Sequence, residues 1–272
     1  MMRPPPRILA IAGSDSSGGA GIQADIKTIT MLGGYAMTAI TAVTAQNTVG
    51  VQGIAPLSGE MVRDQITSCL SDIGADAIKI GMIHDVGIVN AVADLLAGLP
   101  DGARVVLDPV MISTSGATLI AEDAIGAMRE RLFPLATVVT PNLPELEHLA
   151  GRSLRDGDEV AGAARELAER HGCAFLAKGG HQPRQSDGDR VLDLLMFPDG
   201  DFSQFGDERI DTRHTHGTGC TLSSAIATLL GHGQPLPHAV RLARQFVRRA
   251  ILAAPEFGGG NGPLGHQAVR GG

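Results

Sequence analysis

The chain has 272 residues, a length that suits one large α/β domain better than two small ones. Apolar residues make up 43% and aromatic residues only 3%, so we expect a core of aliphatic side chains. The formal net charge of -7 disfavours nucleic acid and anionic membranes as partners.

The three cysteines, Cys69, Cys173 and Cys220, show no metal-ligand spacing, and their odd count disfavours a disulfide framework. The chain opens without a secretory signal pattern, and its most apolar window, Ala36–Ala45, is too short to span a bilayer. We therefore expect a soluble protein of the reducing cytoplasm.

Short apolar runs alternate with helical patterns over the first two thirds of the chain. We predict strands at Ile8–Gly13, Thr38–Gln46, Ala77–Gly81, Arg104–Asp108, Ala136–Pro141 and Ala174–Gly180. The helical patterns between them cover Ala20–Met31, Gly59–Ile73, 86–97, 121–132 and 158–171. This alternation predicts a mainly parallel sheet with helices on both faces.

The alternation of strands and helices stops after Gly180, where a polar, turn-rich loop begins. Val191–Phe197 and the stretch near 201–210 are typical of an antiparallel pair, and helices follow at Thr218–Leu230 and Pro237–Ala253. Residues 1–255 are therefore expected to form a single domain. Residues 256–272 are Gly-rich, and we expect a flexible, dispensable tail.

Polar groups follow five of the six predicted strands. Ligands of open parallel sheets bind beyond the carboxyl ends of the strands, so these positions are candidates for a site. The first strand leads into a Gly/Ser-rich loop, Gly13–Gly21, which either approaches a ligand closely or is a flexible turn. The later strand ends carry Gln46, Met82, Asp108 with Val110, Asn142 with Glu145, and Lys178.

The strongest local signal is the segment Thr215–Cys220, in which a Gly-Thr-Gly turn leads into a helix. The free N–H groups and dipole of a helix start suit a phosphate, and Gly217 and Gly219 would let the backbone approach it. A thiol in the first turn has a lowered pKa, so Cys220 is a candidate base, or else a small core cysteine. His214 and His216 lack a third metal ligand nearby, and we interpret them as loop residues, with His216 near phosphate.

Glu145, Asp25 and Lys178 each have two possible interpretations. Asn142 and Glu145 could hold Mg²⁺ through water, or Glu145 could be a helix-start acid favoured by the dipole. Asp25 lies one turn into its helix and is either solvated or turned towards the pocket. Lys178, at a buried strand end before Gly179, favours a phosphate partner over a solvated charge.

The ordered motifs GSDSSGGAGIQADIKT, TAVTAQNT, KIGM, LDPVM, TPNLPE, KGGH and THGTGCT resemble the hydroxymethylpyrimidine/phosphomethylpyrimidine kinases of thiamine biosynthesis. The resemblance runs from about Ile8 to Ala253, and seven motifs in order are far more specific than any one of them. It implies a three-layer ribokinase-like fold and a homodimer. It also implies two ATP-dependent steps, phosphorylation of 4-amino-5-hydroxymethyl-2-methylpyrimidine and then of its monophosphate.

The resemblance also implies roles for individual residues. Gln46 would bind the aminopyrimidine, and the same pocket would be lined by Gly13, Ala20, Asp25, Met82 and Val110. Mg-ATP would be served by Asn142, Glu145, Thr215 and His216, without a fixed protein cage for the metal. Asp108 would lie near metal and phosphates, or fix a turn. Lys178 would touch the transferred phosphate, and Gly217, Thr218, Gly219 and Cys220 would form the anion hole, with Cys220 as base.

Two alternatives stay open. Some pyridoxal kinases of this branch share the GTGC loop but use a second cysteine after DPVM, where Ile112–Gly116 has none. Some members also carry lysine at the position of Thr114. The other alternative is a non-catalytic pyrimidine sensor, which would need Gln46 but not Cys220.

Overall fold

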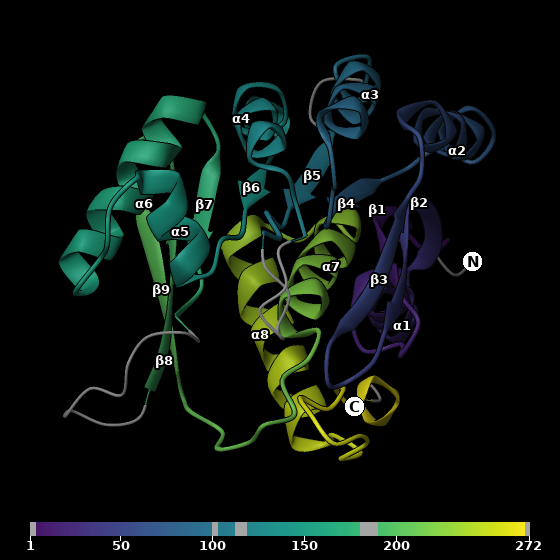
Figure 1. The fold of residues 1–272 in the computed structure, drawn as a ribbon. Helices are drawn as coiled ribbons and strands as arrows, with labels where there is room; N and C mark the ends of the chain where they lie inside the picture. Colours follow the sequence, from purple (N-terminus) through teal and green to yellow (C-terminus); the bar gives the residue numbers. More distant parts are fainter. Residues whose placement is uncertain (1–3, 100–102, 112–118, 180–189, 270–272) are drawn as a thin grey trace.

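The computed structural model describes residues 4–99, 103–111, 119–179 and 190–269. Their strands form one nine-stranded sheet (Figure 1). The strand order is β3-β2-β1-β4-β5-β6-β7-β8-β9. The strands are β1 (Arg7–Asp15), β2 (Tyr35–Gln46), β3 (Val51–Pro56), β4 (Ala77–Ile80), β5 (Arg104–Leu107), β6 (Val138–Val139), β7 (Ala174–Ala177), β8 (Arg190–Met196) and β9 (Phe202–Glu208). The six strands from β2 to β7 in this order pair in parallel, and β3, β8 and β9 are antiparallel additions at the edges.

Helices cover both faces of the sheet, as predicted (Figure 1). They are α1 (Gly21–Met31), α2 (Gly59–Asp72), α3 (Val86–Leu96), α4 (Glu122–Arg131), α5 (Leu143–Ala150), α6 (Gly157–His171), α7 (Thr218–Gly231) and α8 (Leu236–Leu252), with short 3₁₀ turns η1 (Phe133–Leu135) and η3 (His266–Ala268). The core against one face is built with α2 to α6, and the core against the other with α1, α7 and α8.

Strand β1 illustrates why the central strands are continuous apolar runs. Leu9 and Ile11 pack into the core of one face, while Ile8 and Ala10 pack into the core of the other. Because side chains alternate between the two faces of a strand, every side chain of a strand covered on both faces is buried, and an apolar residue is favoured at each position.

Two elements were absent from the prediction. Strand β3 pairs antiparallel with β2, but most of its side chains are exposed, so it has no apolar run to identify it. Helix α5 begins immediately after Asn142 and has only eight residues, too few for a clear helical period. The strand predicted at Ala136–Pro141 is reduced to the two residues of β6.

The C-terminal segment differs from the mobile tail that we expected. Up to residue 269 it packs against the domain, with Leu264 and Val269 buried beside Phe246 and Ala250 of α8. Glycine allows this close packing, since a Cβ on Gly265 would lie 1.9 Å from the carbonyl oxygen of Ala253. A few buried side chains therefore hold a segment whose composition resembles a linker.

None of the helices in the described ranges combines the length and the apolar character needed to cross a membrane.

Candidate active site

A cavity of about 870 Å³ opens at the carboxyl ends of the parallel strands. All but one of the residues that we assigned to a site line it: Gly13, Ala20, Gln46, Met82, Asp108, Val110, Asn142, Glu145, Lys178, Thr215, His216, Gly217, Thr218, Gly219 and Cys220. The volume lies in the range of small-molecule and cofactor sites. The segment Ile112–Gly116, with Thr114, lies outside the described residues.

Asp25 is the exception, and the structure corrects its placement. It is 0% exposed on α1 and forms an ion pair with Lys79 of β4, whose Nζ lies 3.0 and 2.9 Å from its two carboxylate oxygens. The Ser224 hydroxyl donates a third hydrogen bond to it at 2.6 Å. A carboxylate one turn into α1 thus faces the interior between α1, β4 and α7, because Lys79 needs an anion there.

Helix α7 begins at the cavity, and no side chain caps its N-terminus. Gly217 precedes it with φ of 84°, a left-handed conformation that favours glycine. A Cβ on Gly217 would lie 1.8 Å from the carbonyl oxygen of Gly19. A Cβ on Gly219 would lie 3.3 Å from Asp108 Oδ2 and 3.4 Å from Lys178 Nζ, so the helix start faces these two side chains.

Cys220 lies in the first turn of α7 and lines the cavity, but its pKa differs from our expectation. Burial raises the pKa of the thiol to about 11, since the attraction of Lys79 is smaller and Asp25 and Asp108 add negative charge. The helix start does not outweigh these effects. The thiol is therefore protonated at neutral pH.

Lys178, Asp108 and Glu145 form a buried charged cluster beside the start of α7. Lys178 Nζ lies 2.7 Å from Asp108 Oδ1, which also accepts a hydrogen bond from Thr140. Burial raises the pKa of Glu145 to about 7, and the neighbouring Asp108 adds to the shift while Lys178 opposes it. Two carboxyl groups thus share one lysine.

Asn142 and Glu145 also form the capping box of α5. The Asn142 side chain accepts a hydrogen bond from the Glu145 N–H at 3.0 Å, and the Glu145 carboxylate accepts one from the Asn142 N–H at 2.8 Å. The helix-start interpretation of Glu145 is therefore correct for its local structure. Both residues line the cavity as well, so capping places them at the site.

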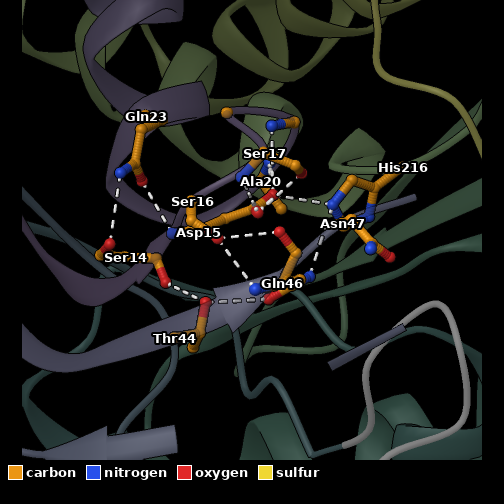
Figure 2. Close-up of polar contacts among 12 residues, drawn as sticks. Ser14, Asp15, Ser16, Ser17, Ala20, Gln23, Thr44, Gln46, Asn47 and His216 are labelled. Carbon is orange, nitrogen blue, oxygen red and sulfur yellow. Dashed lines mark hydrogen bonds and ion pairs between the residues drawn. The ribbon is translucent and has the colours of Figure 1, made fainter. Parts of the chain in front are cut away.

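A second polar cluster joins the first loop to the start of α7 (Figure 2). Asp15 Oδ2 lies 2.8 Å from His216 Nε2, and the Asp15 carboxylate also accepts hydrogen bonds from Ser17, Gly19 and Ala20. Although burial alone would raise the pKa of Asp15, these hydrogen bonds hold it well below its usual range. Gln46 approaches the same histidine at 3.5 Å.

We did not single out Asp15 from the sequence, because it lies among serines and glycines that suggest a turn. His214, in contrast, is buried and does not line the cavity.

A third cluster at the cavity was also missed. Arg244 of α8 is buried and bridges Asp193 and Asp207 at 2.6 Å each, while the N–H of Gly179 donates to Asp193 at 2.7 Å. The ion pairs join α8 to β8 and β9. An arginine inside a strongly amphipathic helix was the only sequence signal for it.

A family model described as phosphomethylpyrimidine kinase matches residues 15–265. The chain belongs to this family. A hydroxymethylpyrimidine/phosphomethylpyrimidine kinase of Streptomyces coelicolor is 48% identical over 263 residues, 96% of this chain and 94% of the relative. A bifunctional thiamine biosynthesis protein of Geobacter sulfurreducens is 46% identical over 95% of this chain, and the chain spans 52% of that relative's length.

Two solved structures have a fold similar to that of this chain, one a pyridoxal kinase and one a phosphomethylpyrimidine kinase. An ADP complex of Bacillus subtilis pyridoxal kinase superposes with a TM-score of 0.86 at 34% identity, covering 98% of this chain and 99% of the other. A phosphomethylpyrimidine kinase of Clostridium difficile superposes with a TM-score of 0.78 at 37% identity, covering 90% and 99%. The predicted fold class and kinase family are confirmed.

Proposed function

We propose that this chain transfers phosphoryl groups from ATP to 4-amino-5-hydroxymethyl-2-methylpyrimidine and then to its monophosphate. The observation that carries the proposal is one cavity that unites a neutral hydrogen-bonding side chain, Gln46, with an anion-binding helix start at Gly217–Cys220. Membership of the phosphomethylpyrimidine kinase family and the similarity to the Streptomyces coelicolor kinase support it.

The chain's own residues would position the reactants. Phosphoryl transfer depends mainly on alignment and on stabilising the charge of the transferred group. The N–H groups at the start of α7 and the Lys178 ammonium face the same space, so they would hold the phosphoryl oxygens there. Gln46 would orient the pyrimidine so that its hydroxymethyl group meets the phosphate.

The cluster of Asp108 and Glu145 fits Mg²⁺. Carboxylate oxygens are preferred ligands of this ion. Burial first, and Asp108 second, raise the pKa of Glu145 to about 7, so a bound cation would favour the ionised form of this carboxyl. Asp108 and Glu145 would hold the ion, with Asn142 and Thr215 on the nucleotide side. His216, which the sequence assigned to the nucleotide, lies beside Gln46 instead. Bound there, Mg²⁺ would neutralise phosphate charge.

Cys220 is proposed to receive the proton of the substrate hydroxyl. With a pKa of about 11 the thiol must first lose its own proton, so only a small thiolate fraction could act as base at neutral pH. The rate of the wild-type chain should then rise with pH between 7 and 9.5. Cys220→Ala should lower kcat by about 10²–10⁴-fold and abolish that rise. A parallel rise in both proteins would remove the thiolate from the mechanism.

The deciding experiment is a coupled assay with ATP, Mg²⁺ and either the hydroxymethylpyrimidine or pyridoxal. Sequential formation of the mono- and diphosphate would support the proposal. Efficient turnover of pyridoxal alone would replace it with vitamin B6 kinase activity. That activity is the second candidate because the Bacillus subtilis pyridoxal kinase has a similar structure. Gln46→Ala should weaken pyrimidine binding without changing ATP affinity. Binding without ADP release would indicate a sensor.

We further propose a cytoplasmic homodimer that acts on a small molecule, with no nucleic-acid or membrane partner. A light-scattering mass of one chain would contradict the dimer.

A further inference from the structure

The side-chain amide of Gln46 lies between two polar neighbours at the edge of the cavity (Figure 2). On one side Gln46 Nε2 lies 3.5 Å from His216 Nε2, and on the other Gln46 Oε1 lies 3.3 Å from Thr44 Oγ1. A carboxamide has a donor end and an acceptor end of nearly the same shape, so its neighbours decide which end points where.

His216 carries a proton on Nε2. That nitrogen lies 2.8 Å from the buried Asp15 Oδ2, and an ionised carboxylate can only accept. The Asp15 carboxylate also accepts N–H bonds from Gly19 and Ala20, which stabilise its charge. Nε2 therefore carries its hydrogen whether the imidazole is neutral or protonated. That proton points to Asp15, but an oxygen is still a better neighbour for this N–H group than a second donor.

Thr44 offers a lone pair. Its hydroxyl lies 2.7 Å from the carbonyl oxygen of Ser14, which cannot donate, so the single hydroxyl proton is used in that bond. Towards Gln46 the Thr44 oxygen can only accept. With its nitrogen towards His216 and its oxygen towards Thr44, as Figure 2 shows it, the amide sets donor against donor and acceptor against acceptor. Turning the amide by 180° removes both mismatches, because its oxygen then faces His216 and its nitrogen faces Thr44.

We propose that Asp15, His216 and Thr44 are positioning residues that fix the Gln46 amide with Oε1 towards His216 and Nε2 towards Thr44. This inference rests on the proposed function, in which Gln46 binds the pyrimidine.

The fixed amide would determine specificity. A 4-aminopyrimidine presents an N–H donor beside a ring-nitrogen acceptor, whereas the 4-oxo analogue in its N–H form presents the reverse order. A freely turning amide could match both patterns, but a fixed amide matches one. Asp15 and His216 would therefore select between two ligands of almost equal shape by fixing the Gln46 amide.

The kinetic test compares kcat/KM for the 4-amino and 4-oxo forms of the hydroxymethylpyrimidine. The wild type should favour the 4-amino compound by about 100-fold. His216→Phe keeps a ring but removes the N–H, and Thr44→Val keeps the shape but removes the acceptor. Each should reduce that ratio by about tenfold, the effect of one buried hydrogen bond. Gln46→Ala removes the amide and gives the ratio of kcat/KM values in its absence.

Met82→Leu is the matched control, because the Met82 side chain lines the same cavity but is apolar and cannot orient the Gln46 amide. It should lower both rates together and leave the ratio unchanged. An unchanged ratio in His216→Phe and Thr44→Val would overturn the proposal and leave both residues a structural role only.

A second measurement needs no substrate, so it separates this inference from the proposed function. In the labelled, ligand-free protein, the side-chain NH₂ protons of Gln46 should show nuclear Overhauser contacts to the Thr44 methyl group. Contacts to the ring protons of His216 in their place would refute the orientation. Failure of the pyrimidine assay with the expected contacts would refute only the function.

Discussion

Replacing Asp25 with alanine should destabilise the folded chain while leaving the pyrimidine site intact. Asp25 and Lys79 are both 0% exposed and are joined by two hydrogen bonds of 3.0 and 2.9 Å. Burial alone would lower the pKa of Lys79, but the Asp25 carboxylate, with Asp108 nearby, holds it above its usual value. Lys79 is therefore charged and depends on its partner.

The magnitude follows from the charge that would be left behind. Breaking a buried ion pair by removing one member costs about 3–5 kcal/mol, a large part of the 5–15 kcal/mol that stabilises a typical protein. With a urea m-value of about 3 kcal/mol/M, the denaturation midpoint of Asp25→Ala should fall by about 1–1.7 M. Circular dichroism at increasing urea concentration measures it.

Two controls separate the buried charge from other effects. The double variant Asp25→Leu with Lys79→Met should regain much of the lost stability, since replacing a whole buried pair by apolar side chains is often nearly neutral. Asp76→Ala breaks an ion pair with Arg7 that is also multiply hydrogen-bonded but exposed to solvent, so its midpoint should move far less. An unchanged midpoint in Asp25→Ala, with a raised KM for the pyrimidine, would refute this reasoning and return Asp25 to the pocket.

Three further outcomes are expected. Because the pKa of Glu145 is about 7 in the folded chain and about 4.5 in the unfolded chain, the wild type loses stability as pH rises through that range. The free energy of unfolding of Glu145→Gln, relative to wild type, should therefore grow by up to about 1.4 kcal/mol per pH unit there. The same difference at pH 5 and pH 8 would contradict this prediction. Gly217→Ala should lower kcat more than ATP affinity in the coupled assay, because its Cβ would lie 1.8 Å from the Gly19 carbonyl oxygen and force the loop away; wild-type kcat would disprove the need for glycine. Removing residues 256–272 should lower the thermal midpoint by uncovering α8, whereas Phe257→Ala, at an exposed position, should not; a melt equal to wild type would mean that the segment contributes nothing.

The sequence predicted the central strands and the position of the cavity well, because both depend on local pattern. Strand β1 is a continuous apolar run in the sequence and is buried on both faces in the structure. The polar residues at the strand ends meet because parallel strands end at the same edge. The glycine turn before α7 was identifiable for the same reason, since its backbone conformation is specified by neighbouring residues.

What escaped prediction depends on partners distant in the chain. Asp25 looked like a residue of a helix start, and only its contact with Lys79 makes it an interior anion. Cys220 lies at a helix start that should lower its pKa, yet burial and two carboxylates from other elements outweigh that effect. Asp15 gained its significance from His216, which follows it by about two hundred residues. Periodicity and motif spacing contain no information about such pairings.

The contact between the first loop and the start of α7 has a consequence for recombination. A Cβ on Gly19 would lie 2.4 Å from the His216 ring, and one on Gly217 would lie 1.8 Å from the Gly19 carbonyl oxygen, so each loop fits only the other as it is. Chimeras that join the amino-terminal part of one relative to the carboxy-terminal part of another would therefore bring together two loops that had changed separately. Their activity should depend less on overall identity than on whether both loops come from the same parent.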